Sequence, residues 1–216
     1  MKIKAFIFDL DGVLVHTDRF HYLAWKSVAG ALGVPFDEGV NDRLRGVSRE
    51  DSLEIVLEGY TGEPLSAAEK TSLCERANAI CRGYLSAMTP GDVPEDVRET
   101  LRVLRARGYR LAVGSSSKNA KLVLGRTGLM DAFDAVSDGT NVTRAKPDPE
   151  VFLKAAEFLG VPSSDCAVVE DAAAGIDAAK AGGFAAIGIG AAAAYGKTDH
   201  PIHALPDLLP LAPALI

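Results

Sequence analysis

Short apolar runs alternate with helical patterns along most of this chain, and no other feature limits its fold as strongly. Runs of strand length lie at Lys4–Phe8, Arg110–Gly114, Ala135–Ser137, Ala167–Val169 and Ala185–Ile189. Helical patterns separate the later runs. Because strands that alternate with helices are joined by right-handed crossovers, this order predicts a mainly parallel α/β sheet.

Four helices are expected in the α/β part of the chain. They lie at Glu95–Arg107, Lys118–Arg126, Pro149–Leu159 and Ala172–Ala181. In the first of them, Val97, Leu101 and Leu104 recur at helical spacing and define an apolar face. Gly108 follows that helix at a position where glycine is a common terminator.

Residues 16–87 break the alternation, because they show helical spacing and no convincing strand. Two Ser-x-x-acid patterns, Ser48–Asp51 and Ser66–Glu69, are typical of capping boxes at helix N-termini. The second pattern opens a long helix. We therefore expect an α/β core made of residues 1–15 and 88–216, interrupted by an all-helical insert of residues 16–87.

Composition excludes several classes of protein. The 216 residues are 48% hydrophobic and 24% charged, as in ordinary globular proteins, and no apolar run reaches the about 18 residues of a membrane span. Three cysteines without a CxxC pair indicate reduced thiols and a cytoplasmic location. The net charge of −6 argues against general nucleic-acid binding. No partner-binding stripe is evident, so a monomer is the default expectation.

The strongest chemical signal is a pair of carboxylates directly after the first apolar run. Asp9 and Asp11 are two residues apart, and Gly12 permits a turn that brings both to one site. Ligands bind at the carboxyl ends of strands in open parallel sheets. One carboxylate can attack a phosphorus centre while the other moves a proton. The alternative interpretation is a turn rich in Asp and Gly without catalytic function.

Three further polar segments follow expected strands or precede expected helices. Ser115–Asn119 combines hydroxyls, an ammonium group and backbone N–H groups that suit an anion. Lys146 precedes a helix, where a fixed cation can neutralise phosphate oxygens. Glu170 and Asp171 end another apolar run and offer the oxygen ligands that Mg²⁺ needs. Taken singly, each segment also reads as a helix cap or a surface residue.

In this order, the four segments resemble the motifs of the haloacid dehalogenase (HAD) superfamily of phosphotransferases, whose core is a Rossmann-like parallel sheet. The resemblance implies that Asp9 is a nucleophile that becomes an aspartyl phosphate and that Asp11 is a general acid/base. It also implies that Ser115 and Lys146 bind the transferring phosphate. A Mg²⁺ site is implied at Asp9, Asp11, Glu170 and Asp171. The helical insert would be a cap domain, and Asp11 speaks against the dehalogenase branch.

Within that superfamily, the insert resembles the β-phosphoglucomutase family. The resemblance rests on His16–Asp18, His21–Lys26, Leu44–Leu53 and Ser115–Asn119. It implies interconversion of β-glucose 1-phosphate and glucose 6-phosphate through a sugar bisphosphate. The implied substrate-binding residues are Thr17, His21, Trp25, Leu44, Gly46, Val47, Ser48, Arg49, Ser117, Lys118 and Asn119. Among them, Arg49 and the segment from Ser117 to Asn119 would hold the phosphate that is not being transferred.

Two positions depart from that family, and several alternatives stay open. His16 stands where some relatives carry an acidic residue, and Ala77 stands where relatives often carry a basic one. Arg76 and Arg82 are candidates to replace the missing charge. The alternatives are a Mg²⁺-dependent sugar-phosphate phosphatase, a mutase for another β-sugar phosphate, and a non-catalytic phosphosugar-binding protein. His21 and Trp25, four residues apart, also fit a helix packing face.

Overall fold

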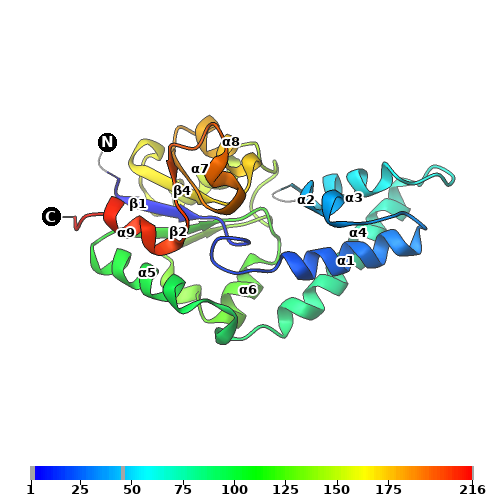
Figure 1. The fold of residues 1–216 in the computed structure, drawn as a ribbon, viewed down its shortest axis with the longest axis horizontal. Helices are drawn as coiled ribbons and strands as arrows, with labels where there is room; N and C mark the ends of the chain where they lie inside the picture. The colour runs from blue at the N-terminus through cyan, green and yellow to red at the C-terminus, as the bar shows by residue number, and fades with distance from the viewer. Residues whose placement is uncertain (1–2, 45–46, 216) are drawn as a thin grey trace.

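A six-stranded parallel sheet forms the centre of the computed structural model, which describes residues 3–44 and 47–215 (Figure 1). The strand order is β3-β2-β1-β4-β5-β6, and each neighbouring pair is parallel. The strands are β1 (Ala5–Phe8), β2 (Arg110–Gly114), β3 (Ala135–Ser137), β4 (Cys166–Glu170), β5 (Ala185–Gly188) and β6 (His200–Pro201). The predicted parallel α/β sheet is confirmed. The sequence analysis missed β6, because two residues that include a proline carry no apolar pattern.

The central strands β1, β2 and β4 are mostly apolar because helices cover both faces of the sheet. Figure 1 shows α5 (Glu95–Ala106), α6 (Ala120–Thr127) and the short α9 (Leu208–Leu211) on one face, and α7 (Glu150–Leu159) and α8 (Ala173–Ala181) on the other. The central strand β1 alternates between the two resulting cores. Phe6 and Phe8 pack into the first, and Ala5 and Ile7 into the second.

The helix ends follow the expected signals with small shifts. Helix α7 ends at Gly160, which adopts the left-handed conformation with φ of 66° that glycine tolerates best. The helix expected from Lys118 begins two residues later, at Ala120. Short 3₁₀ helices lie at Pro90–Asp92, Met130–Ala132, Ser163–Asp165, Gly190–Ala194 and Leu205–Asp207.

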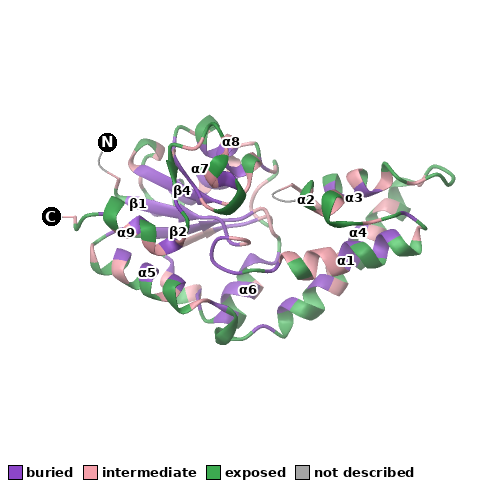
Figure 2. Ribbon diagram, in the orientation of Figure 1, coloured by how far each residue is buried: buried purple, intermediate pink, exposed green. Residues whose placement is uncertain are grey.

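In the described part of the chain, four α-helices lie between β1 and α5 and extend away from the sheet (Figure 1). They are α1 (Asp18–Ala31), α2 (Glu38–Asp42), α3 (Arg49–Leu57) and α4 (Ala67–Ser86). A separate apolar cluster that includes Trp25, Val28, Leu53 and Val56 packs α1, α3 and α4 together. Figure 2 shows buried residues alternating with intermediate and exposed ones along these helices. The division into two domains at residues 15/16 and 87/88 stays a prediction.

Of the two expected capping boxes, the one at Ser66 is complete, and Ser48 forms a simple N-cap. Ser66 and Glu69 form the complete capping box at the start of α4, with each side chain bound to the other residue's backbone N–H. Ser48 caps α3 by accepting the N–H of Asp51 at 3.0 Å. No helix in the described segments is long and apolar enough to cross a membrane.

Candidate active site

The site lies where β1, β2 and β4 end side by side. Phe8 pairs in register with Val113 of β2 and Val169 of β4, so Asp9 emerges between these two neighbours. The N–H of Asp9 donates to the carbonyl oxygen of Val169 at 2.9 Å, which fixes the first residue beyond the strand. The same edge carries Ser115 after β2. The expectation that these polar residues meet at the carboxyl edge of the sheet holds.

A buried lysine joins two of the carboxylates. The Nζ of Lys146 lies 2.6 Å from Oδ1 of Asp9 and 2.5 Å from Oε1 of Glu170, and it sits 4.7 Å from the ring centroid of Phe152. Burial alone would lower the pKa of Lys146, but the Asp9 and Glu170 carboxylates raise it above its ordinary value. Lys146 is therefore a permanent cation in the site and not a solvated surface residue.

Three carboxylates form a group that suits a divalent cation. One oxygen from each of Asp9, Glu170 and Asp171 lies within 4.8 Å of the others. Burial, followed by repulsion from Asp9 and Glu170, raises the pKa of Asp171 to about 8. A single lysine does not balance three acids, and hard oxygen donors are the ligands that Mg²⁺ prefers. The side chain of Asp11 lies outside this group, so its metal contact stays a prediction.

Two glycines allow the backbone to come this close to the acids. Gly12 has φ of 83°, and a Cβ there would overlap the carboxylate of Asp171. A Cβ at Gly175 would overlap the carboxylate of Glu170. The glycine of the first motif is thus required both by the turn and by the neighbouring acid.

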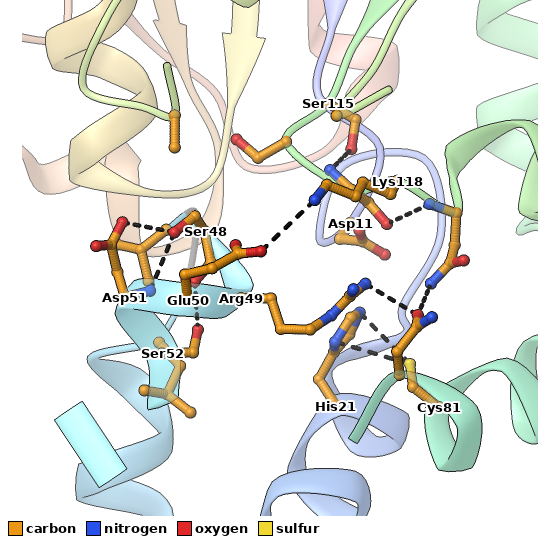
Figure 3. A pocket seen from close by; sticks show the side chains of 18 of the residues that line it. Asp11, His21, Ser48, Arg49, Glu50, Asp51, Ser52, Cys81, Ser115 and Lys118 are labelled. Atoms are coloured by element: carbon orange, nitrogen blue, oxygen red, sulfur yellow. Dashed lines mark hydrogen bonds and ion pairs between the residues drawn. The ribbon is translucent and has the colours of Figure 1, made fainter. Parts of the chain in front are cut away.

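Asp11 lies in a polar group of its own beside the three acids. The hydroxyl of Thr17 donates to Oδ1 of Asp11. Burial raises the pKa of Asp11, while nearby His21 opposes that rise. The ring nitrogens of His21 lie 3.8 and 4.0 Å from Sγ of Cys81 on α4, as Figure 3 shows. A carboxyl with a raised pKa holds its proton more readily, as a general acid must.

The pKa of His21 is also raised. Burial alone would lower it, but the hydrogen bond and charge of Cys81 and the carboxylates of Asp11 and Asp18 raise it to about 9. The imidazole is therefore positively charged at neutral pH. It links the start of α1 with α4, and the sequence analysis did not single out Cys81.

A cavity of about 490 Å³ extends from Asp9 and Asp11 into the space bordered by the helical insert. Its volume is in the range of small-molecule sites. The predicted residues that line it are Asp9, Asp11, His21, Trp25, Leu44, Val47, Ser48, Arg49, Ser115, Ser117, Lys118 and Asn119. Thr17, Lys146, Glu170 and Asp171 are not among its lining residues and support the site from outside the cavity. Gly46 lies outside the described residues.

Arg49 reaches the cavity from α3 and is held by an amide that the sequence analysis missed. Its Nη2 donates to Oδ1 of Asn78 at 2.9 Å, and Nδ2 of Asn119 donates to the same oxygen at 3.0 Å. Asn78 thus connects the helical insert with the core. The sequence carries one signal for Asn78: it is a polar residue at helical spacing from Cys74 and Cys81, on the same face of α4.

The two positions at which the sequence departs from the β-phosphoglucomutase family, His16 and Ala77, lie in different surroundings. Ala77 is buried and lines the cavity without offering charge. Arg76 and Arg82 are both exposed, but Arg82 donates from Nη1 to Oδ1 of Asn119 at 2.8 Å. His16 is exposed as well. Of the two arginines considered as replacements, Arg82 is the one that contacts a site residue.

The turn after β2 is organised by its own side chains. Oγ of Ser115 accepts the N–H of Ser117, and Oγ of Ser117 accepts the N–H of Asn119. Lys118 extends toward α3, where its Nζ lies 3.5 Å from Oε1 of Glu50 (Figure 3). The turn therefore presents an ammonium group and an amide to the cavity.

Two predicted substrate residues also have structural roles. Trp25 is buried in the apolar cluster of the helical insert and lines the cavity as well. Ser48 caps α3 while bordering the cavity. Their contacts with a substrate stay predictions.

Residues 3–183 match the family model described as haloacid dehalogenase-like hydrolase. The chain belongs to this family. It is 42% identical over 189 residues to the β-phosphoglucomutase of Bacillus subtilis, a match that covers 87% of this chain and 84% of that protein. The expected superfamily is thereby confirmed.

Other family members extend the comparison. The chain is 31% identical over 184 residues to a Thermotoga maritima protein named phosphorylated carbohydrates phosphatase, covering 84% of this chain and 82% of that protein. The crystal structure of a β-phosphoglucomutase from Clostridium difficile matches with a TM-score of 0.89 at 34% identity, covering 95% of this chain and 93% of that one. Mutases and phosphatases of phosphorylated carbohydrates are therefore both among the relatives.

Proposed function

We propose that this protein is a β-phosphoglucomutase that interconverts β-glucose 1-phosphate and glucose 6-phosphate. The observation that carries the proposal is a second set of anion-binding groups in the cavity that Asp9 borders. Arg49, Lys118 and Asn119 line that cavity together with Asp9. A sugar bisphosphate needs one site at each end, whereas a phosphatase needs only the first. The 42% identity to the Bacillus subtilis enzyme supports the same conclusion.

In the proposed reaction, a carboxylate oxygen of Asp9 attacks the phosphorus of a hexose bisphosphate. The bond from phosphorus to the sugar oxygen breaks, and Asp11 gives its proton to that oxygen. Lys146, already bound to Asp9, opposes the charge on the phosphoryl oxygens. Mg²⁺, which Asp9, Glu170 and Asp171 would hold, supplies further charge neutralisation when bound.

The hexose monophosphate formed in this way leaves, and the isomer that carries its phosphate at the other end binds. The second transfer then runs in the opposite direction at the free hydroxyl of that isomer, and the bisphosphate formed reorients before the next cycle. Asp11 removes the proton from the acceptor hydroxyl, and that oxygen attacks the phosphorus of phospho-Asp9. Arg49, Lys118 and Asn119 hold the phosphate that is not reacting. Because either end of the bisphosphate can occupy either site, one set of residues serves both half-reactions.

Transfer to sugar must be faster than transfer to water. The helical insert borders the cavity, and the ion pair of Lys118 with Glu50 joins the insert to the core. An insert that closes over the substrate excludes water from phospho-Asp9. A site less well closed would make the protein a sugar-phosphate phosphatase, the activity named for the Thermotoga maritima relative.

One assay separates these activities. The protein is incubated with β-glucose 1-phosphate, Mg²⁺ and a trace of the bisphosphate, and glucose 6-phosphate and free phosphate are measured in parallel. Glucose 6-phosphate is the expected main product. Dominant release of phosphate would refute the mutase, and the same assay with other β-sugar phosphates tests the alternative that another sugar is preferred.

We further expect a cytoplasmic monomer that acts on small sugar phosphates and not on nucleic acid or membranes. The cytoplasmic location rests on the cysteine pattern, and the exclusion of nucleic acid on the acidic composition. The exclusion of membranes rests on the lack of a long apolar run in the sequence, and the monomer on the lack of an evident partner-binding stripe.

A further inference from the structure

A hydrogen bond outside the proposed catalytic residues joins the helical insert to the core. Arg82, near the end of α4, donates from Nη1 to Oδ1 of Asn119 at 2.8 Å. Asn119 directly precedes α6 and is only 3% exposed, although it lines the cavity. The bond therefore ends on a residue that faces substrate.

The two ends of the Asn119 amide have different partners. Oδ1 accepts from Arg82, and Nδ2 donates to Oδ1 of Asn78, which also accepts from Arg49. An amide has one accepting end and one donating end. Turning it over would place its NH₂ group against the guanidinium of Arg82. The arginine thus fixes which end of Asn119 lies beside Asn78 and Arg49.

We propose that Arg82 is a positioning residue for the phosphate that is not being transferred. It is not among the residues that line the cavity, so it acts through Asn119 and not by touching substrate. Its permanent charge polarises the amide and makes the Nδ2–H groups better donors to an anion. This inference rests on the proposed function, because it assigns a role within the second phosphate site.

The chain offers a matched control on the same helix. Arg76 has the same charge and is exposed on α4, but none of its described contacts involves a residue of the cavity. Replacing either arginine removes one positive charge from the same helix. A difference between the two variants then reports the contact with Asn119 and not the net charge.

The test compares Arg82→Met, Arg82→Lys and Arg76→Met with the unaltered protein. We expect Arg82→Met to raise KM for β-glucose 1-phosphate about tenfold, because a charge-assisted hydrogen bond is lost. The rate at which acetyl phosphate phosphorylates Asp9 should not change, since that donor has no second phosphate. Arg82→Lys should recover part of the loss, and Arg76→Met should match the unaltered protein.

Two results would overturn this inference. One is an equal KM in Arg82→Met and Arg76→Met. The other is an equal loss in the sugar-phosphate and acetyl phosphate reactions of Arg82→Met, which would indicate general damage to the site. KM is determined from the rate at which hexose phosphate is consumed, so its value does not depend on which product forms. If phosphate is the main product, the mutase proposal fails, but the KM values of the Arg82 and Arg76 variants still test the role of Arg82. If no hexose phosphate is consumed, both proposals fail.

Discussion

At the scale of single residues, the balance of charge around Asp9 explains most of the site's chemistry. Asp9 shares Lys146 with Glu170, and Asp171 adds a third acid. The group therefore carries more negative than positive charge, and burial, followed by repulsion from Asp9 and Glu170, raises the pKa of Asp171 to about 8. A divalent cation would correct the imbalance and prepare the site for a phosphate dianion.

Replacing the proposed nucleophile tests the first chemical step. Asp9→Asn keeps the shape of the side chain but removes the carboxylate that, in the proposed reaction, attacks phosphorus. We expect no phosphorylated protein after incubation with acetyl phosphate, measured by intact-mass spectrometry. Phosphorylation at the level of the unaltered protein would show that another residue is the nucleophile.

Arg49 provides a separate test of the second phosphate site. Arg49→Ala should raise KM for the hexose monophosphate at least tenfold while leaving phosphorylation by acetyl phosphate unchanged. Arg43→Ala is the control, because Arg43 pairs on the surface with Glu58. An equal fall of both reactions in Arg49→Ala would contradict its assignment to the distal phosphate.

The raised pKa of His21 predicts a pH-dependent contribution to stability. Its pKa rises from 6.5 to about 9, so the charged form stabilises the folded protein fully below about pH 6.5 and ceases to do so as the pH passes about 9. In urea unfolding, the stability advantage of the unaltered protein over His21→Asn should shrink between these values. An advantage that stays constant with pH would contradict this account of His21.

At the scale of elements, close packing at strand and helix ends places the acids. Helix α8 starts two residues after Asp171, and Gly175 in its first turn lies against Glu170. Helix α6, by contrast, carries Gly125 at an exposed position with no atom near the site of an added Cβ. Substitution of these two helical glycines should therefore have opposite effects on stability.

Alanine at these glycines gives a matched pair of variants. Gly125→Ala should stabilise the protein by about 0.5–1 kcal/mol, because it adds only helix propensity. Gly175→Ala should destabilise it by about 1–3 kcal/mol, since the added methyl group overlaps the buried carboxylate of Glu170. Urea unfolding measures both, and equal effects would refute the packing argument.

Elements governed by local patterns were predictable from sequence, and contacts between elements were not. Strand β2 and the capping box of Ser66 matched their expected positions because burial and local hydrogen bonding determine them. Asn78 and Cys81 were missed because a sequence does not show which face of α4 meets the core. Arg82 was a candidate only as one of two arginines, and its contact with Asn119 distinguishes it.

At the scale of the whole molecule, contacts of different strength join the helical insert to the core around the cavity. The pair of Lys118 and Glu50 spans 3.5 Å between exposed side chains, and such pairs contribute little to stability. The hydrogen bonds of Asn119 with Arg82 and Asn78 are shorter and partly buried. The net charge of −6 does not prevent binding of an anionic sugar, because Arg49, Lys118 and Lys146 oppose it locally.

Metal binding should be visible in the stability of the whole protein. A cation bound by the folded acids but not by the unfolded chain stabilises the folded state by mass action. Mg²⁺ at a hundredfold excess over its Kd should raise Tm by about 5 °C or more, whereas KCl of equal ionic strength should not. Asp171→Asn should lose most of this rise. An identical rise in that variant would place the metal elsewhere.

The fate of the phosphoryl group on Asp9 tests the central claim most directly. The protein is labelled with ³²P from a small phosphate donor, freed of that donor, and mixed rapidly with β-glucose 1-phosphate and Mg²⁺. The account predicts that most of the label passes to glucose bisphosphate and then to glucose 6-phosphate. Release of the label as free phosphate, at the same rate with and without the sugar, would contradict it.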